Sequence, residues 1–269
     1  MQKKLYYHES DLFPYEPISP ILMIIYSLSS FWFFTILNQT IKRTNIDKTN
    51  WLKHNILLSC IHAAICSALL IISVLREPKI FQDPLSHSNH FNYALVAFTT
   101  GYFLYDLIDC IRNSTSSTIA FLIHHILVMM FFIHVLFHSR NLGYAIYGLS
   151  IEINSLFLHA RRLFRWYSPI LTSMYLNNLL QICIDIGNYV TFILFRFGIV
   201  IVGLRALYIQ RNRLNPIAHV FTVIITAAMG ILNIVLFSRL VKGHFMRKLK
   251  VKQIEDQSLT INNPILLPS

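Results

Sequence analysis

Seven apolar runs, separated by short polar loops, constrain the fold of this chain more than any other feature. One helical crossing of a bilayer core about 30 Å thick needs about 20 predominantly apolar residues. Because a backbone in lipid must satisfy its own hydrogen bonds, we expect an all-α, polytopic membrane protein with about seven transmembrane helices. The runs cover approximately Ile18–Leu37, Asn55–Leu75, Phe91–Ile111, Ile119–Phe137, Leu142–Leu158, Leu176–Leu204 and Ile217–Leu240. The fifth run is short, and Gly187, Gly198 and Gly203 could break the long sixth run.

Composition excludes a soluble domain, because hydrophobic residues make up 55% and charged residues only 13% of the chain. Soluble domains carry about 25% charged residues. The net charge of +11 does not predict a nucleic-acid partner, since Lys and Arg lie almost entirely in short loops, where they set topology. The four cysteines lie inside or at the end of apolar runs without a C-x-x-C pair, so neither a disulfide framework nor a zinc site follows.

The Lys and Arg residues also predict the orientation of the chain. Of 23, eight lie in the N-terminal tail and the even-numbered loops, and fourteen lie in the odd-numbered loops and the C-terminal tail. The side with more Lys and Arg is cytosolic, so we expect a lumenal N-terminus and a cytosolic C-terminus. The first helix is expected to be retained, because no signal-peptide core with a cleavage site precedes it. The glycosylation sequons at Asn38 and Asn113 then lie in cytosolic loops and should carry no glycan.

Ionisable residues in three successive runs predict a site within the membrane. Asp106 and Asp109 end the third run, His124 and His125 begin the fourth, and Glu152 lies late in the fifth. At about 1.5 Å rise per residue, all five fall within roughly 6–14 Å of the same membrane face. Such groups are costly at membrane depth and usually mark function, so we take these five as candidate catalytic residues. Adjacent histidines diverge by roughly 100° on a helix, so only one of them can point squarely at a given spot.

A second group of polar residues lies deeper in the runs and supplies candidate substrate-binding residues. Two interpretations stay open for this group, because polar side chains also hold membrane helices together by hydrogen bonds. In the same way, Ser155 and His159 could be ordinary packing and boundary residues. The deeper residues are Asp185, Asn188, Arg196 and Asn233, and Asn154, at the depth of the candidate catalytic residues, is added to the candidate substrate-binding residues.

No metal and no resident cofactor is predicted. Adjacent histidines point apart, and the candidate residues show no H-x-x-x-H or E-x-x-H spacing. His134 and His138 are four residues apart, but they lie near the opposite membrane face with no carboxylate beside them in sequence.

The order of these motifs resembles the TLC domain, which is shared by translocating-chain-associated, ceramide synthase and CLN8-type membrane proteins. The resemblance covers about residues 48–245 and implies six helices around a cytosol-facing cavity. Residues 1–17 would then form a lumenal tail, 18–47 an additional helix and loop, and 246–269 a cytosolic tail. The motifs are Tyr105-Asp106-Leu-Ile-Asp109, His124-His125, Glu152-Ile-Asn154-Ser155-Leu-Phe157 with Arg161, and Phe195-Arg196.

Within this family the chain departs from the ceramide synthases. Their His-His pair, matched here by His124 and His125, is followed one helix later by a His-Asp…Asp pattern. This chain has Ser150-Ile151 and Asn154 at those places. It more closely resembles the TLC domain-containing proteins of the branch that includes transmembrane protein 56 (TLC domain-containing protein 4). That resemblance implies a role in lipid homeostasis in the endoplasmic reticulum, with phospholipid or sphingolipid partners.

Two functions therefore stay open from the sequence. The first is binding, sensing or remodelling of membrane lipids. The second is a ceramide-synthase-like acyltransferase that uses acyl-CoA as co-substrate. In that case His124 or His125 would be the base or nucleophile, because an imidazole can both take and return a proton near neutral pH. The sequence identifies no protein partner.

Overall fold

The computed structural model describes residues 17–43, 51–81, 84–85, 88–113, 119–171, 174–213 and 215–262. All regular structure in these ranges is helical. Residues 1–16 of the expected N-terminal tail and residues 44–50, in the loop after the first helix, lie outside the described residues. The elements are α2 (Pro20–Arg43), α3 (Trp51–Arg76), the 3-10 helix η1 (Pro78–Phe81), α4 (His90–Asn113), α5 (Ile119–His138), α6 (Leu142–Leu149), α7 (Ile151–Leu171), α8 (Met174–Thr191), the π-helix η3 (Phe192–Phe197), α9 (Gly198–Ile209) and α10 (Pro216–Asn262).

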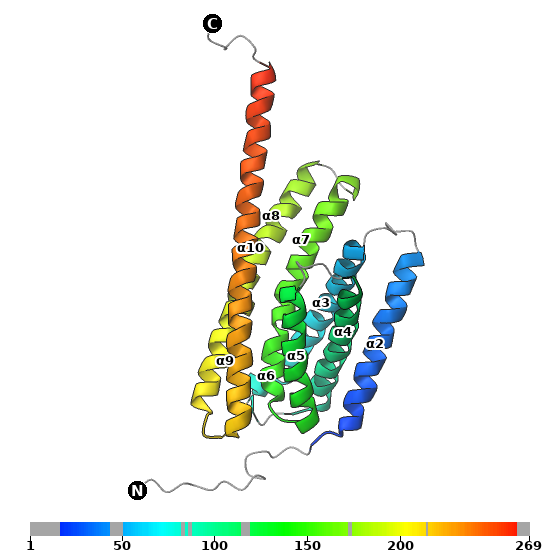
Figure 1. Ribbon diagram of the computed structural model, residues 1–269, viewed down its shortest axis with the longest axis vertical. Helices are drawn as coiled ribbons and strands as arrows, with labels where there is room; N and C mark the ends of the chain where they lie inside the picture. Colours follow the sequence, from blue (N-terminus) through cyan, green and yellow to red (C-terminus); the bar gives the residue numbers. More distant parts are fainter. Residues whose placement is uncertain are drawn as a thin grey trace.

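The long helices stand side by side, and successive ones run in opposite directions (Figure 1). Five helical stretches are long and apolar enough to cross a membrane, and Leu122–His138 is a shorter apolar helix. Large aliphatic side chains such as Ile133 and Ile234 are exposed on the outer faces, where lipid replaces water. The prediction of an all-α, polytopic membrane protein is therefore confirmed. The five stretches are Pro20–Lys42, Trp51–Arg76, His90–Asn113, Asn177–Ile209 and Pro216–Gly243.

The fifth run differs from the expected single short helix. α6 ends at Leu149, a turn at Ser150 follows, and α7 continues to Leu171, well beyond the expected end at Leu158. The Ser150 hydroxyl donates a hydrogen bond of 2.5 Å to the Tyr147 carbonyl, and such side-chain bonds compete with the regular helical pattern. This turn places Glu152 in the first turn of α7, where the helix dipole favours a carboxylate.

The sixth run is not broken by its glycines, although its helical geometry changes. α8 passes into the π-helix η3 at Phe192 and returns to α-helix at Gly198. Single π-turns inside α-helices often occur at functional sites, because they re-aim the side chains that they carry. The η3 segment carries Arg196, which is 5% exposed.

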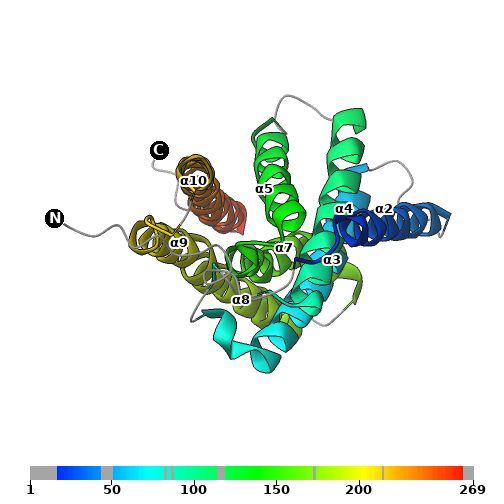
Figure 2. The ribbon, with the colours of Figure 1, turned by 90° about the horizontal axis from the view of Figure 1, so that it is seen from below.

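The first helix, α2, packs at one edge of the bundle (Figure 2) and contributes no residue to the cavity described below. Its contact with α4 is close, because an added Cβ at Gly101 would lie 2.1 Å from the Ser27 carbonyl oxygen. The hydroxyls of Ser27 and Ser30 donate to the carbonyls of Ala97 and Phe98 at 3.0 and 2.6 Å. Small residues and such bonds are typical of membrane-helix contacts.

Candidate functional site

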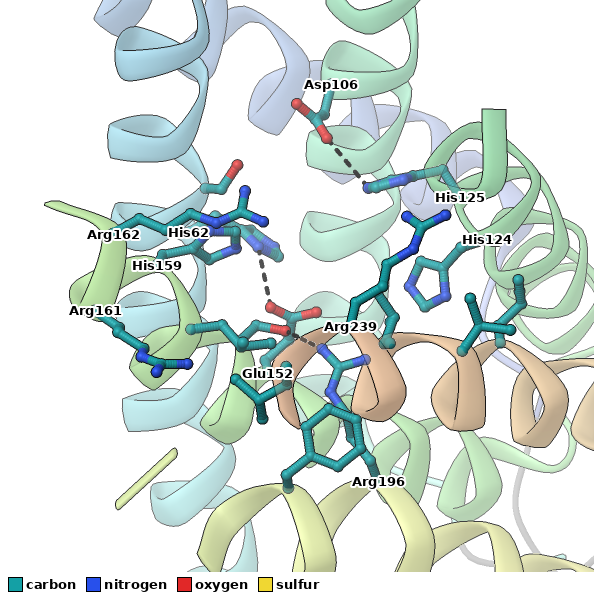
Figure 3. A pocket seen from close by; sticks show the side chains of 18 of the residues that line it. His62, Asp106, His124, His125, Glu152, His159, Arg161, Arg162, Arg196 and Arg239 are labelled. Atoms are coloured by element: carbon teal, nitrogen blue, oxygen red, sulfur yellow. Dashed lines mark hydrogen bonds and ion pairs between the residues drawn. The ribbon is translucent and has the colours of Figure 1, made fainter. Parts of the chain in front are cut away.

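A cavity of about 340 Å³ lies between α3, α4, α5, α7, η3 and α10 (Figure 3). Along α7 its lining residues run from Glu152 to Arg165, and along α10 from Leu232 to Gly243. At about 1.5 Å per residue, these stretches give a depth of roughly 16–20 Å. We call the end at Glu152 the floor, and the end at Arg165 and Gly243 the mouth. The mouth lies toward the end of the bundle from which α10 projects (Figure 1).

One wall carries a histidine–carboxylate pair between α4 and α5. His125 Nε2 lies 3.2 Å from Asp106 Oδ2, and the two side chains are 5% and 1% exposed. Asn55 Nδ2 donates to the other carboxylate oxygen, Asp106 Oδ1, at 2.6 Å. Phe103 packs edge-on against the His125 ring, with centroids 5.0 Å apart. The carboxylate, the amide and the aromatic ring therefore hold the imidazole in one orientation.

The opposite wall carries a second pair, between α3 and α7. His62 Nδ1 lies 3.8 Å from Glu152 Oε2, which is within ion-pair range but long for a hydrogen bond. The His62 ring stacks on Tyr102 at a centroid distance of 3.8 Å, and Tyr102 donates to Ser59 at 2.9 Å. The other ring nitrogen, His62 Nε2, lies 3.1 Å from Cys66 Sγ, and Cys66 is not among the lining residues. Two imidazoles thus face one space, each beside a buried carboxylate.

Two further histidines line the cavity with a ring nitrogen that is not bonded. Nδ1 of His124 and Nδ1 of His159 are buried and have no hydrogen-bond partner among the described residues. The His124 and His125 rings lie 5.5 Å apart at 80°, so each of them addresses a different part of the cavity. Buried polar atoms without partners are uncommon in proteins and call for an explanation, such as a ligand.

Arg196 forms the floor of the cavity and is held from three sides. Its Nε donates to Asn154 Oδ1 at 2.6 Å, Nη1 to Asn233 Oδ1 at 3.1 Å and Nη2 to the Ser155 hydroxyl at 3.2 Å. Asn154 is itself fixed by donating to Asn188 Oδ1 at 3.1 Å. This network joins α7, η3 and α10 and makes the floor polar and closed.

The mouth is rich in arginine. Arg161 is buried and paired with Asp185, with Nε 2.5 Å from Oδ1. Arg162, Arg165 and Arg239 are exposed lining residues (Figure 3 labels Arg162 and Arg239). In the described part of the chain, neither Arg162 nor Arg239 forms an ion pair. With two lining carboxylates against five lining arginines, of which one is neutralised by Asp185, the cavity favours an anionic ligand.

The structure brings together four of the five candidate catalytic residues, since Asp106, His124, His125 and Glu152 all line the cavity. Asp109 lies outside the lining and accepts hydrogen bonds from Trp51 Nε1 at 2.7 Å and from Asn55 Nδ2 at 3.4 Å. It therefore lies behind Asp106, and Asn55 connects the two carboxylates.

Of the deeper candidate group, only Arg196 lines the cavity. Asn154 and Asn233 bind Arg196 directly, and Asn188 binds Asn154. Asp185 pairs with Arg161. Contact of these residues with a substrate stays a prediction. In the structure they form hydrogen bonds and an ion pair between helices.

Several lining residues were not predicted from the sequence. His62 is an ionisable residue in the middle of an apolar run, so the rule that singled out His124 could also have identified it. His159 was interpreted as an ordinary boundary residue. The arginines at 162, 165 and 239 were interpreted only as topology determinants, because each lies at the end of an apolar run.

Metal binding finds no support in the geometry of the site. Among the described residues, no three His, Cys, Asp or Glu side chains converge as metal ligands would. The two histidine–carboxylate pairs instead lie on opposite walls (Figure 3).

Comparison with known proteins gives one consistent result. A family model described as "TLC domain" matches residues 54–242. TLC domain-containing protein 2 of Danio rerio is 28% identical over 240 residues, which cover 87% of this chain and 95% of that protein. TLC domain-containing protein 1 of Homo sapiens is 25% identical over 78% of this chain and 83% of its own length. No solved structure matches the chain significantly.

Proposed function

The chain belongs to the TLC domain family, and from this membership we propose that it binds a membrane lipid in the cavity and acts in membrane lipid homeostasis. Family membership confirms the resemblance inferred from the sequence motifs. The nearer likeness to the transmembrane protein 56 branch stays a prediction, because the relatives reported above are TLC domain-containing proteins 1 and 2.

The observation that carries this proposal is a charged cavity inside a bundle whose outer faces are apolar. Phe103, Phe192, Leu232 and Leu236 supply apolar surface beside the histidines and arginines. A volume of about 340 Å³ is at the lower end of the range for small-molecule sites, roughly 300–1,000 Å³. It suits the head of an amphiphile and the beginning of its chain.

The excess of arginine indicates the charge of that head. A guanidinium forms two parallel hydrogen bonds with a phosphate or carboxylate, so Arg162 and Arg239 are suited to hold an anionic headgroup at the mouth. Lys42 and Arg112 lie at the mouth end of the bundle and add to its positive charge. We propose that this end faces the cytosol and that the N-terminus lies in the lumen of the endoplasmic reticulum.

Lipid retention by the purified protein tests this proposal. Wild-type protein in mild detergent should carry a bound anionic lipid in native mass spectrometry, and the double variant Arg162→Gln, Arg239→Gln should retain at least tenfold less. Arg112→Gln is the matched control, because Arg112 is exposed near the same end of the bundle but does not line the cavity. Equal retention by all three proteins would contradict the proposal.

Acyl transfer from acyl-CoA is the second candidate function, and the His125–Asp106 pair favours it. His125 would take the proton from an acceptor hydroxyl or amine as that group attacks the thioester carbonyl, and the CoA thiolate would leave and gain a proton. Asp106 at 3.2 Å would orient the imidazole and stabilise its protonated form. Ser150, Ile151 and Asn154, in place of the second ceramide synthase motif, weigh against this candidate.

The two candidate functions differ in how steeply activity depends on His125. If the protein is an acyltransferase, His125→Ala should lower product formation from acyl-CoA by about a hundredfold to ten-thousandfold. His138→Ala is the control, because His138 lies at the other end of α5 outside the cavity. Lipid retention without any histidine-dependent product would exclude acyl transfer and leave binding as the function.

A further inference from the structure

α5 and α10 contact each other near the floor end of the bundle. Nearer the mouth, residues of both helices line the cavity. The His134 ring of α5 contacts the Phe221 ring of α10, with centroids 5.7 Å apart. Ten residues along α5 toward the mouth lies His124, about 15 Å away at the helical rise. Ten residues from Phe221 in the same direction along α10 lies Ile231. At this level Leu232, Val235 and Leu236 line the cavity opposite His124.

The two flanks of α10 differ at this level. On one flank, Asn233 binds Arg196, and Phe237 contacts Phe192 at 5.2 Å, so this side is packed against η3. Val235 lies on the other flank. It lines the cavity and is 39% exposed, and at about 100° per residue it lies between the lining residue Leu232 and the exposed Ile231. The cavity wall therefore continues into the lipid-facing surface past Val235.

The surfaces on both sides of this opening are apolar and face the bilayer. On α10, the neighbours of Val235 on the outer face are Ile231 and Ile234, which are 64% and 59% exposed. On α5, Ile123 stands beside the lining residue His124 and is 47% exposed.

The floor excludes a hydrocarbon chain from any deeper position. Below the histidines lies the Arg196 network, whose polar groups already bind one another. Inserting a chain there would bury apolar surface against charged groups and break these bonds. An amphiphile held by its head at the arginines must therefore direct its chain either out of the mouth toward water or sideways past Val235.

We propose that the cavity opens sideways into the bilayer between α5 and α10, and that one acyl chain of an anionic amphiphile lies in this opening, against Leu232 and Val235. The inference rests on the proposed lipid binding and adds the path of the chain. Keeping the chain in hydrocarbon retains the transfer free energy of each CH₂ group, whereas an exit at the mouth would lose it.

Photocrosslinking tests the path directly. The full chain is reconstituted in nanodiscs that contain either an anionic phospholipid or a free fatty acid with a diazirine near the start of the chain, and crosslinked peptides are mapped by mass spectrometry. We expect crosslinks concentrated on Leu232, Val235 and Leu236, and Val235→Trp should reduce them at least fivefold. The lipid form that gives the stronger crosslinks identifies the source of the anionic head.

Ile234→Trp is the matched control, because it adds the same bulk to the adjacent lipid-facing position and should leave the crosslinks unchanged. Val235→Phe is a smaller block for use if Val235→Trp does not accumulate. Crosslinks no stronger on Val235 than on Ile231, and insensitive to the block, would overturn the sideways opening even if Arg162 and Arg239 prove necessary for lipid retention. If wild-type protein retains no lipid at all, both proposals fail.

Discussion

Two sets of polar side chains occupy this bundle, and they differ in whether the side chains are paired with one another. In the saturated set, Arg196 binds Asn154 and Asn233, and Arg161 pairs with Asp185. In the open set, His124 and His159 each have a buried Nδ1 without a hydrogen-bond partner among the described residues, and Arg162 and Arg239 form no ion pair there. Residues of the saturated set hold helices together, whereas those of the open set have bonding capacity left for a ligand.

This comparison predicts opposite consequences of mutation in the two sets. Changes in the saturated set should lower stability, because they leave buried groups without partners. Changes in the open set should lower ligand binding and affect stability little. The expected effects on stability decrease from the buried ion pair, through the Arg196 network, to the histidines.

The largest loss of stability is expected for Asp185→Ala. It leaves the Arg161 guanidinium, 5% exposed, without its carboxylate at 2.5 Å. Breaking a buried ion pair by removing one partner costs about 3–5 kcal/mol. Thermal unfolding of the detergent-solubilised protein, followed by size-exclusion fluorescence, should show a melting temperature lowered by many degrees.

The double variant Asp185→Ala, Arg161→Met provides the control for this pair. It removes both charges, so most of the lost stability should return. A double variant as unstable as Asp185→Ala alone would show that the pair does not act through its charges, and would place these residues outside the saturated set.

A smaller loss is expected for Arg196→Met, which removes three interhelical hydrogen bonds at the floor. At about 0.6 kcal/mol per bond in a membrane protein, the loss should be on the order of 2 kcal/mol. Arg205→Met is the control, because Arg205 is exposed on α9. Equal melting temperatures for the two variants would mean that the Arg196 network contributes no stability.

These differences also show what the sequence could and could not predict. The apolar runs set the number and order of the helices, because the length of a bilayer crossing fixes the length of each run. Depth was predictable only in part. Asp106, His124 and Glu152 do line one cavity, but Glu152 lies in the first turn of α7 at the floor, deeper than a run ending at Leu158 implied.

The rotation of each helix was not predictable from the runs. In a helix that is apolar all round, periodicity does not reveal which face is buried, so the sequence did not show that His62 faces the cavity and stacks on Tyr102. The turn at Ser150 and the π-helix at Arg196 re-aim the side chains that follow or lie within them, and neither deviation has a periodic signature. For the same reason the second histidine–carboxylate pair emerged only from the packing.

The adjacent histidines provide the sharpest test of the comparison, because His125 is paired with Asp106, whereas Nδ1 of His124 has no hydrogen-bond partner among the described residues. His125→Ala removes the imidazole 3.2 Å from the buried Asp106 carboxylate and should lower stability by about 1 kcal/mol, the lower end of the cost of a buried polar group that loses its partner. His124→Ala removes a ring whose Nδ1 has no partner, so its melting temperature should stay close to that of the wild type. Thermal unfolding and lipid retention should be measured on the same preparations.

For His124→Ala, the effect on lipid retention and the effect on stability should differ. We expect His124→Ala to lower lipid retention severalfold at unchanged stability, whereas His125→Ala lowers both. His134→Ala serves as the control for the loss of an imidazole from α5, because His134 contacts Phe221 outside the cavity. If His124→Ala instead lowers stability and leaves retention intact, His124 belongs with the saturated set.

The last prediction concerns topology, and here no change in glycosylation is expected. The Arg196 network lies at the floor, and the exposed arginines lie toward the mouth. Our orientation puts that mouth at the cytosolic face, where Lys and Arg are in excess. Asn38 and Asn113 then never meet the glycosylation machinery of the lumen, so Asn38→Gln and Asn113→Gln should migrate like the wild type before and after endoglycosidase treatment.

A positive control is available in a sequon introduced at the opposite end of the bundle, near Arg211, which should gain a glycan. A glycan on Asn38 or Asn113 would reverse the orientation and place the arginine-rich mouth in the lumenal leaflet.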